Sequence, residues 1–295
     1  MLFFLMFVVI ELPYLLVLVT GFILRYHKHY PKLDLAHSPH VVINLTAYSE
    51  GELIELAIAS LAEQDYVGHI TILVTVDGGS KHNKKTVDAG YAMIKKYPHL
   101  DIKIIDKPHR KGRVDSNNTG LAYCIKNNIK YMLILDADTS CSKKTISSFV
   151  RIMEHEPKLS ALSGSIKVRN LNSIVTKLTY IEYAVGIVLS RFGLDVMGYV
   201  NNCSGAFSFF RVSDIERIGG WRTGTAEDLD LTLRMYIHKY KIAHCSNAIA
   251  YTDSPENFIG LCKQRLTWSG DMIFLLKRYI NYLFLAKEVY QLSNT

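Results

Sequence analysis

The feature that most constrains the fold is a run of five apolar residues, 131–135, that leads directly into Asp136, Ala137 and Asp138. Such a run between polar residues is typical of a strand buried on both faces of a parallel sheet. Because side chains alternate along a strand, Asp136 and Asp138 should point the same way at its carboxyl end, where open α/β sheets bind ligands. Two close carboxylates repel unless a cation separates them, and oxygen ligands favour Mg²⁺ or Mn²⁺. The alternative is a polar strand end with helix-capping Asp residues.

Short apolar runs and helical patterns alternate around this strand. Further strands are predicted at 41–45, 70–76 and 102–105. This order predicts an α/β fold with a doubly wound, mostly parallel sheet. The helical pattern of 52–61 indicates one apolar face, formed by Leu53, Leu56, Ala57 and Leu61. The turn at 46–51 lacks Gly-x-Gly-x-x-Gly, so a dinucleotide cofactor is not expected.

The N-terminal segment predicts a membrane anchor. Residues 2–24 are almost uncharged, and as a helix they could span about 30 Å of hydrocarbon. The basic flank that follows predicts a cytoplasmic location for the rest of the chain. A cleaved signal peptide is the alternative, but no basic region precedes the apolar run. We expect a transmembrane anchor with its basic flank at 1–30, a central domain at 38–255 and amphipathic interfacial helices at 256–295.

The overall charge limits the classes of partner, and the cysteines indicate the redox state of the thiols. The net charge of +7 is compatible with nucleic acid, an anionic membrane surface or a polyanionic small ligand. Basic residues occur as scattered pairs without an aromatic-interleaved stripe, so no nucleic acid partner is expected. The five cysteines are dispersed and show no Cys-x-x-Cys spacing, which favours reduced thiols in a cytosolic compartment and predicts no zinc site.

Two strand ends carry groups suited to a nucleotide. Tyr48 and Glu50 follow the first predicted strand and offer an aromatic ring and a carboxylate, which could stack on a base and accept from its N–H. Asp77 ends the second strand and adds another acceptor at the same edge. Each of these residues, taken alone, could equally be a loop residue or a helix cap.

Seven segments, in order, resemble motifs of the processive, membrane-bound family 2 glycosyltransferases, which include hyaluronan, chitin, cellulose and poly-N-acetylglucosamine synthases. The segments are Tyr48-Ser49-Glu50, Val76-Asp77-Gly78-Gly79-Ser80, Gly112-Arg113-Val114-Asp115 with Asn118-Thr119-Gly120, Asp136-Ala137-Asp138, Cys203-Ser204-Gly205, Thr225-Ala226-Glu227-Asp228 and Gln264-Arg265-Leu266-Thr267-Trp268. The resemblance implies a nucleotide-sugar-binding domain of the glycosyltransferase A type at 38–255.

The resemblance also implies a set of donor-binding residues. Tyr48, Glu50 and Asp77 would hold the uracil and ribose of a UDP-sugar. Arg113 and Asp115 would hold the donor sugar and diphosphate, with Arg113 in place of the family's usual lysine. Arginine keeps the positive charge and adds a bidentate fork for phosphate oxygens.

For the metal and the catalytic base, the resemblance implies three carboxylates. Asp136 and Asp138, mainly Asp138, would bind Mg²⁺ or Mn²⁺ and neutralise charge on the UDP leaving group. Asp136 would also contact the donor. Asp228 would be the general base that accepts the proton of the acceptor hydroxyl. An ordinary structural role is open for Asp228 too, because acidic residues favour the first turn of a helix, here expected at 229–238.

On the acceptor side, the resemblance implies binding of acceptor or product by Ser204, Gly205, Glu227, Gln264, Arg265 and Trp268. Trp268 would form an apolar platform for the acceptor sugar. The family's arginine before that tryptophan is Thr267 in this chain, which removes an expected cation. The segment 258–285 is apolar and aromatic but carries five charges, the pattern of a helix that lies in a membrane interface.

The combined expectation is an inverting, metal-dependent glycosyltransferase that uses a UDP-sugar as its donor. Its carbohydrate acceptor would be a growing β-linked polysaccharide, to which it adds the sugar. It would be a membrane protein with a single-pass anchor and a cytoplasmic catalytic domain. The family's channel-forming spans are not found before Thr295, so two expectations are open: the sequence is a piece of a longer synthase, or it is a short enzyme that needs a channel-forming membrane partner for export. The alternatives are a single-step transferase acting on a lipid or protein, and a catalytically silent nucleotide-sugar-binding subunit.

Overall fold

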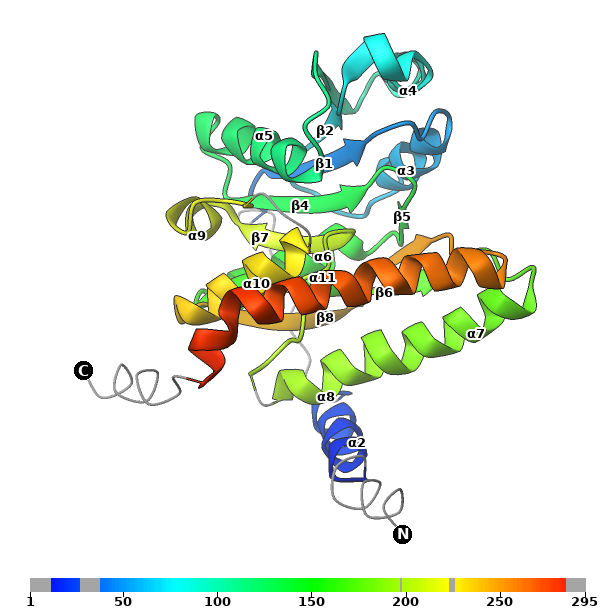
Figure 1. Cartoon of the computed structure of the whole chain (residues 1–295). Helices are drawn as coiled ribbons and strands as arrows, with labels where there is room; N and C mark the ends of the chain where they lie inside the picture. Colours follow the sequence, from blue (N-terminus) through cyan, green and yellow to red (C-terminus); the bar gives the residue numbers. More distant parts are fainter. Residues whose placement is uncertain (1–11, 27–37, 197, 223–225, 285–295) are drawn as a thin grey trace.

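The computed structural model describes residues 12–26, 38–196, 198–222 and 226–284, and an eight-stranded mixed sheet forms its centre (Figure 1). The strands are β1 (Val41–Ala47), β2 (Ile70–Val76), β3 (Asp101–Asp106), β4 (Tyr131–Asp136), β5 (Ser140–Cys141), β6 (Leu159–Val168), β7 (Phe207–Arg211) and β8 (Lys241–Thr252). Their spatial order is β3-β2-β1-β4-β7-β6-β8-β5. The four strands predicted in the first half of the chain are confirmed, each within two residues at either end.

The first half of the sheet is parallel, as predicted. β3, β2, β1 and β4 are neighbours and run in the same direction. Their register pairs Ala47 with Val76 and Thr46 with Asp136. The carboxyl ends of β1, β2 and β4 therefore meet at one edge, and the polar residues that follow each strand are brought together there.

The second half of the sheet is mixed, so the prediction of a mostly parallel sheet holds for the first half only. β7 is antiparallel to both β4 and β6, β6 is parallel to β8, and β5 is antiparallel to β8. The reversal of β7 follows from where the chain enters it. Phe207 pairs with Leu135, at the carboxyl end of β4, so β7 begins at the edge where the parallel strands end and must run the other way.

Helices cover both faces of the sheet (Figure 1). One face packs against α3 (Leu53–Ala62), α4 (Gly79–Lys96) and α6 (Thr145–His155), and the other packs against α5 (Arg113–Lys126), α9 (Val212–Arg217) and α10 (Glu227–Ile237). Side chains alternate as a doubly wound sheet requires, with Ile43 and Leu45 in the first layer and Val42 in the second. Both layers are therefore filled by the apolar runs that identified the strands.

The apolar face predicted for α3 is wrong in part. The buried residues of α3 are Ile54, Ala57, Ile58 and Leu61, whereas Leu53 and Leu56 are exposed. The helix is apolar on more than one side, and the position of the sheet decides which side is covered.

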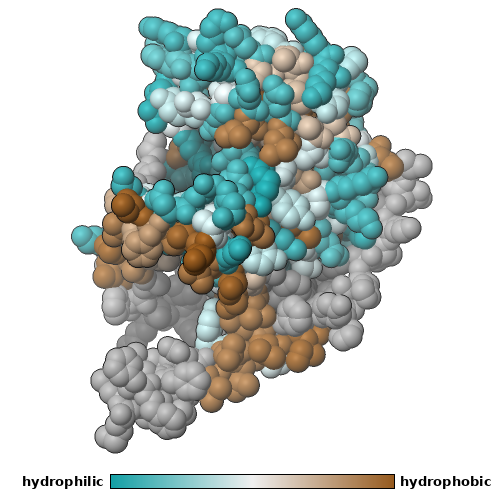
Figure 2. Space-filling model, turned by 90° about the vertical axis from the view of Figure 1, so that its right-hand side faces the viewer, coloured by the Kyte–Doolittle hydropathy of each residue, from teal (hydrophilic) through white to brown (hydrophobic). Residues whose placement is uncertain are grey.

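The remaining helices are α2 (Leu12–Tyr26), α7 (Ile174–Tyr183), the π-helical turn η3 (Ala184–Leu189), α8 (Ser190–Val196) and α11 (Phe258–Phe284). In Figure 1, α2, α7 and α8 lie in the lower part of the molecule, and α11 runs across the view at the height of β6 and β8. α2 crosses α8 at two glycines, and a Cβ on Gly21 would lie 2.4 Å from the Cα of Gly193. Figure 2 shows that the hydrophobic colour gathers in this lower part, while the upper part is hydrophilic. Exposed apolar side chains on α2, α7 and α11 explain this division.

The predicted transmembrane anchor falls partly outside the described residues, since 2–11 are not among them. Among the helices that the structure describes, none combines the length and the apolar character needed to cross a bilayer. The anchor therefore stays a prediction.

Candidate active site

A cleft of about 190 Å³ opens at the carboxyl edge of the parallel strands. It lies between the ends of β1, β2 and β4 and the first turns of α5. The residues that line it are Thr46, Ala47, Tyr48, Glu50, Asp77, Arg113, Ser116, Asp136 and Asp138. Six of these were predicted to bind donor or metal, namely Tyr48, Glu50, Asp77, Arg113, Asp136 and Asp138. The structure thus brings together predicted site residues from four separate segments.

Asp77 is buried in the wall of the cleft and holds the loop that leads into α5. Its Oδ1 accepts hydrogen bonds from Lys107 Nζ at 2.7 Å and from the backbone N–H of Lys111 at 2.9 Å. Its Oδ2 accepts from the backbone N–H of Gly112 at 2.8 Å. Burial raises the pKa of Asp77, but these donors outweigh burial and the pKa lies below its ordinary value. The carboxylate therefore fixes the position from which Arg113 enters the cleft.

Lys107 joins two predicted donor-binding residues from behind the cleft wall. It is 7% exposed, and its Nζ lies 2.7 Å from Asp77 Oδ1 and 2.7 Å from Asp115 Oδ2. Asp115 is thus directed at Lys107 and does not line the cleft. A buried lysine between two carboxylates keeps its charge compensated, and it ties the end of β2 to α5.

Arg113 projects from the first turn of α5 across the cleft and links β4 to α10. Its Nη2 forms an ion pair with Asp136 Oδ1, and its Nη1 lies 3.6 Å from Glu227 Oε1. Asp136 is the main cause that raises the pKa of Arg113, with Glu227 adding to it. The guanidinium is therefore a permanent positive charge at the centre of an acidic site.

The cleft carries an excess of carboxylates that suits a divalent cation. Burial raises the pKa of Glu50, and the charges of Asp138 and Asp136 raise it further. Burial also raises the pKa of Asp136, with Arg113 opposing the rise and Asp138 adding to it. The buried hydroxyl of Thr46 has no hydrogen-bond partner among the described residues. Hard oxygen donors in mutual repulsion fit Mg²⁺ or Mn²⁺, in which case Asp136 and Asp138 would hold the ion.

Asp228, the predicted base, lies in the first turn of α10 and is held by three donors. Its Oδ2 accepts from the backbone N–H of Gly205 at 2.8 Å and from Asn202 Nδ2 at 3.1 Å. Its Oδ1 accepts from the backbone N–H of Leu229 at 2.7 Å. Asn202 is in turn held by the hydroxyl of Thr232, at 3.2 Å from its Oδ1. The carboxylate orientation is therefore fixed before any ligand binds.

Gly205 connects the two sides of the site. A Cβ at this position would lie 3.1 Å from Glu227 Oε1, 3.3 Å from Arg113 Nη1 and 3.4 Å from Asp228 Cβ. Only a glycine leaves the three charged groups this close without displacing one of them. The preceding Ser204 accepts a hydrogen bond from the backbone N–H of Ala206 at 3.3 Å and shapes the turn into β7.

A family model described as glycosyl transferase family group 2 matches residues 131–292, which is more than half of the chain. The chain belongs to this glycosyltransferase family. The resemblance inferred from the sequence motifs is thereby confirmed at the level of the family.

Curated relatives of this glycosyltransferase are synthases of an N-acetylglucosamine polymer. The chain is 27% identical over 82% of its length to poly-beta-1,6-N-acetyl-D-glucosamine synthase of Staphylococcus epidermidis, of which the match covers 58%. It is 26% identical over 88% of its length to the synthase of Staphylococcus aureus strain COL, of which the match covers 63%. The chain thus spans less than two thirds of the length of these relatives.

Solved structures of similar fold include a mannosyltransferase and TarS. A mannosyltransferase from Pyrobaculum calidifontis, in complex with GDP-Man and Mn²⁺, has a TM-score of 0.61 and 18% identity, over 83% of this chain and 67% of the other. S. aureus TarS has a TM-score of 0.53 and 18% identity, over 73% of this chain and 37% of the other. At this level of identity the similarity supports the fold alone.

In this glycosyltransferase the predicted acceptor residues of α11 lie apart from the cleft. Gln264, Arg265 and Trp268, here called the α11 set, do not contribute to its lining. Arg265 forms an ion pair of 2.7 Å with Glu182 on α7, and its guanidinium lies 4.3 Å from the Trp268 ring centroid. Trp268 is 46% exposed. The structure therefore brings the predicted donor residues other than Asp115 together with the metal and base residues, and it places the α11 set outside the cleft lining, with Gln264 and Arg265 half-buried and Trp268 exposed.

Three residues that organise the glycosyltransferase site are not among the site residues predicted from the sequence. Lys107 directly follows β3, as Asp77 directly follows β2, so its place at the same sheet edge as Asp77 could have been inferred from the sequence. Asn202 directly precedes the Cys203-Ser204-Gly205 motif, so its proximity to the base could have been inferred from that motif. Arg110, whose guanidinium lies 3.8 Å from the Tyr48 ring centroid, belongs to a basic cluster in the sequence with Lys107 and Lys111, and such a cluster is equally compatible with a solvated loop.

Proposed function

We propose that the chain is an inverting, divalent-metal-dependent glycosyltransferase that transfers sugar from a UDP-sugar to a growing β-linked polysaccharide. The observation that carries the proposal is the arrangement of Asp136, Asp138, Arg113 and Asp228 around one sheet edge. A metal-compatible acidic pair, a fixed cation and a fixed carboxylate are the groups that this reaction needs. The names of the relatives support a polysaccharide product, with N-acetylglucosamine as the first sugar to test.

Tyr48, Glu50 and Asp77 would bind the nucleoside part of the donor. Tyr48 is 38% exposed, and with Arg110 against its ring it offers an aromatic platform beside the cleft. Aromatic stacking with a base is typically worth about 1–3 kcal/mol. Within the described residues, the carboxylate of Glu50 accepts a side-chain hydrogen bond from the backbone N–H of Tyr48 and keeps lone pairs for a ligand. Asp77 has its lone pairs largely used, so its main contribution is to hold the loop that carries Arg113.

Arg113 would bind the donor diphosphate. A guanidinium has five N–H donors, and the ion pairs with Asp136 and Glu227 occupy only part of them. The others are available to phosphate oxygens in a bidentate arrangement. A divalent ion held by Asp136 and Asp138 supplies further neutralisation of the charge on the leaving group.

Asp228 would act as the general base through its Oδ1. A carboxylate has about four lone-pair sites, and the described donors occupy two on Oδ2 and one on Oδ1. The remaining site on Oδ1 can accept the proton of the acceptor hydroxyl while its oxygen attacks the anomeric carbon. One base and one leaving group on opposite sides of that carbon imply a single displacement with inversion.

We also propose that the enzyme works at the cytoplasmic face of a membrane. The exposed apolar residues of α7 and α11 support this, since such a surface is unfavourable in water and suits an interface. The predicted single-pass anchor and a channel-forming membrane partner belong to the same proposal. Neither is needed for the chemistry in the cleft.

A single-step transferase that acts on a lipid or protein acceptor is the second candidate. The location of the α11 set favours it, because Trp268 and Arg265 do not form an acceptor platform at the cleft. Thr267 also lacks the charge of the family's arginine, and its hydroxyl donates to the backbone carbonyl of Lys263 at 3.1 Å. A catalytically silent subunit is the third candidate.

The deciding experiment incubates the full chain with a panel of labelled donors, namely UDP-N-acetylglucosamine, UDP-glucose, UDP-glucuronic acid and GDP-mannose, with Mn²⁺ or Mg²⁺. We expect UDP release with one UDP-sugar, a ladder of products by mass, and loss of both on chelation. A single added sugar would favour the second candidate. UDP binding without turnover would favour the silent subunit, and no UDP binding in the presence of metal would overturn the proposal.

A further inference from the structure

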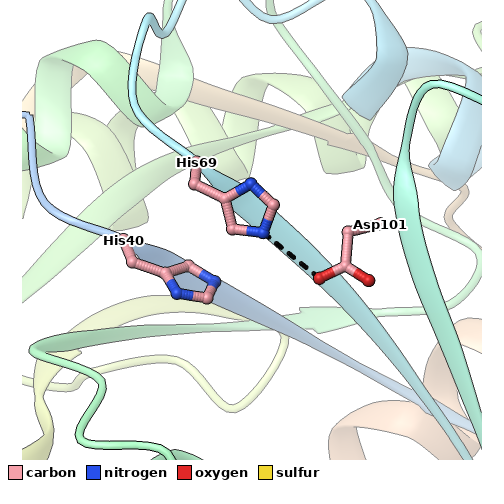
Figure 3. Close-up of side chains that lie close together, drawn as sticks. All are labelled: His40, His69 and Asp101. Carbon is pink, nitrogen blue, oxygen red and sulfur yellow. Dashed lines mark hydrogen bonds and ion pairs between the residues drawn. The ribbon is translucent and has the colours of Figure 1, made fainter.

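The amino edge of the sheet, at the opposite ends of the strands from the cleft, carries two histidines and a carboxylate (Figure 3). His40 precedes β1, His69 precedes β2 and Asp101 begins β3. Because these strands are adjacent and parallel, their first residues lie side by side. One ring nitrogen from each histidine and one oxygen of Asp101 lie within 4.8 Å of one another. We call these three residues the histidine cluster.

Short contacts already connect the histidine cluster. His69 Nε2 lies 3.2 Å from Asp101 Oδ2, and the two histidine rings meet edge to face with centroids 4.4 Å apart. The hydroxyl of Thr71 donates to Asp101 Oδ2 at 2.5 Å and lies 2.8 Å from His40 Nε2. Thr71 therefore orients the carboxylate and one imidazole from within β2, as outer-shell groups commonly do around metal ligands.

We propose that the histidine cluster is a binding site for a divalent transition metal of the zinc class. Two imidazoles and one carboxylate are a recognised ligand set for Zn²⁺, with water in the fourth position. In a tetrahedral site, ligand atoms about 2.0–2.1 Å from the metal are about 3.3 Å apart, so the ligands must approach one another. The side chain of His69 is 59% exposed and can rotate to do this.

The ligand chemistry separates this site from the cleft. The cleft offers oxygen donors, which suit Mg²⁺ or Mn²⁺, whereas imidazole nitrogen favours Zn²⁺, Co²⁺ and Ni²⁺. Within the described residues, the histidine cluster is the one group of three His, Cys, Asp or Glu side chains whose ligand atoms lie this close together. β1, with seven residues, separates the two sites by about 20 Å.

The metal would act as a structural link. His40, His69 and Asp101 come from three neighbouring strands, so one ion would tie the starts of β1, β2 and β3 together. The carboxyl ends of the same strands carry the turns of the cleft. A ligand that binds only the folded chain stabilises it by an amount that grows with the logarithm of its concentration over the dissociation constant.

A substitution at Lys103 tests the proposal by the direction in which it changes the metal affinity. Its Nζ lies 3.6 Å from Asp101 Oδ2, and it donates to the hydroxyl of Tyr123 at 2.8 Å. Its side chain is 47% exposed, so removal of its charge should be tolerated. The ammonium repels a cation bound at Asp101. A neutral residue at position 103 should therefore tighten metal binding, which a simple hydrogen-bond cluster would not predict.

The experiment titrates the chelator-treated full chain with Zn²⁺ by calorimetry, in excess Mg²⁺ to occupy oxygen sites. We expect one equivalent of Zn²⁺ per chain and a rise of a few degrees in Tm. Co²⁺ in place of Zn²⁺ should give visible d–d absorption from nitrogen ligands. Absence of binding under these conditions would overturn the proposal.

Variants assign the binding to the histidine cluster. His69→Asn and His40→Asn should each weaken Zn²⁺ binding by at least about 100-fold, since removal of a ligand exceeds the usual effect of an outer-shell change. His155→Asn, a control on the exposed face of α6, and Asp138→Asn, a control in the cleft, should leave it unchanged. Lys103→Met should tighten it several-fold. Equal affinity in the wild type and in His69→Asn, or loss of binding in Asp138→Asn, would overturn the proposal.

Discussion

The cleft and the α11 set were predicted from motifs of the same family, but the structure holds them in different ways. In the cleft, Asp77 and Asp228 each accept three hydrogen bonds from their surroundings. In the α11 set, Arg265 has one ion pair, with a glutamate that is 54% exposed, and Trp268 is half in solvent. The charges that we propose to act at the reacting bond lie on strand ends and helix starts. The surface that we propose to contact a long product lies on a helix whose motif residues have fewer contacts.

The way in which α11 is attached to the rest of the molecule adds to this difference between the cleft and the α11 set. Its C-terminal half is fixed to α10, because Tyr279 donates to the buried Asp230 at 2.7 Å and Leu275 is buried. Its N-terminal half carries exposed apolar residues such as Phe258 and Leu266, with Gln264 and Arg265 half-buried. The anchored half therefore touches the helix that carries the proposed base, while the N-terminal half carries the α11 set. Substitutions in the cleft should accordingly have large effects, and substitutions on the outer helices should have smaller ones.

The largest effect is expected for Asp228→Asn. Asparagine keeps an oxygen that can accept from the backbone N–H of Gly205, so the local fold should persist. It cannot accept the proton of the acceptor, and general-base catalysis typically contributes about 10²–10⁴-fold. We expect kcat to fall by that factor, measured as UDP release, while UDP binding by calorimetry stays within a few-fold of wild type.

The matched control is Asp88→Asn on α4, where the carboxylate is 59% exposed and pairs only with Lys84 one helical turn away. Its turnover should equal that of the wild type. Turnover in Asp228→Asn at the level of this control would show that another group accepts the proton.

The sequence predicted the cleft well because its geometry is local. Asp77, Asp136 and the residues after β1 each directly follow an apolar run, and the register of a parallel sheet then brings strand ends together. The orientation of Asp115 was not accessible in this way, because it depends on Lys107, whose burial between two carboxylates follows from the loop conformation. The antiparallel direction of β7 was likewise set by where its preceding loop lies.

The position of α11 was the least predictable feature from sequence. Its motif Gln264 to Trp268 defines a helix turn but not the surface against which the helix packs. The contacts that place it depend on partners distant in the sequence, chiefly Asp230 for Tyr279 and Glu182 for Arg265. Long-range pairs of this kind have no periodic pattern that a single sequence would show.

The next effect is that of Asp77→Asn on folding. The change removes the charge that accepts from Lys107, and hydrogen bonds to charged groups contribute about 1.5–3 kcal/mol. We expect a loss of that size in the free energy of unfolding at pH 7, measured by chemical denaturation. UDP affinity should fall as well, because the loop that carries Arg113 loses its anchor.

The stability lost in Asp77→Asn should become smaller in acid. The pKa of Asp77 is lowered in the folded chain, whereas an unfolded Asp has a pKa of about 3.9. Its stabilising contribution is therefore complete above about pH 4 and is lost as the pH falls through the folded pKa. The difference between wild type and Asp77→Asn should shrink below pH 4. A difference that grows in acid would contradict the assignment.

A smaller effect is expected for Tyr279→Phe, which tests how firmly α11 is attached. The change removes one hydrogen bond to Asp230, which is 1% exposed and also binds Arg234 and Arg278. We expect a loss of about 1–2 kcal/mol in the free energy of unfolding, since a buried acceptor loses one of its donors. Hydrogen exchange in α11 should accelerate more than in β1 or β4. Tyr91→Phe, at a residue that is 52% exposed on α4, should change neither.

The smallest effect on stability, and the one that tests the outer helices most directly, is expected for Leu178→Ser on α7. Leu178 is 60% exposed, and exposed substitutions usually change the free energy of unfolding by less than about 0.5 kcal/mol. If the apolar surface of α7 and α11 contacts a membrane, the same change should weaken sedimentation with anionic vesicles several-fold, and Ile181→Ser, at 58% exposure, should add to it. Val67→Ser is the control, because Val67 is 63% exposed but lies in the loop before β2, away from these helices. Equal vesicle binding in all three variants would mean that the exposed residues of α7 serve another purpose, and the contrast between a rigid cleft and a membrane-facing layer would then rest on α11 alone.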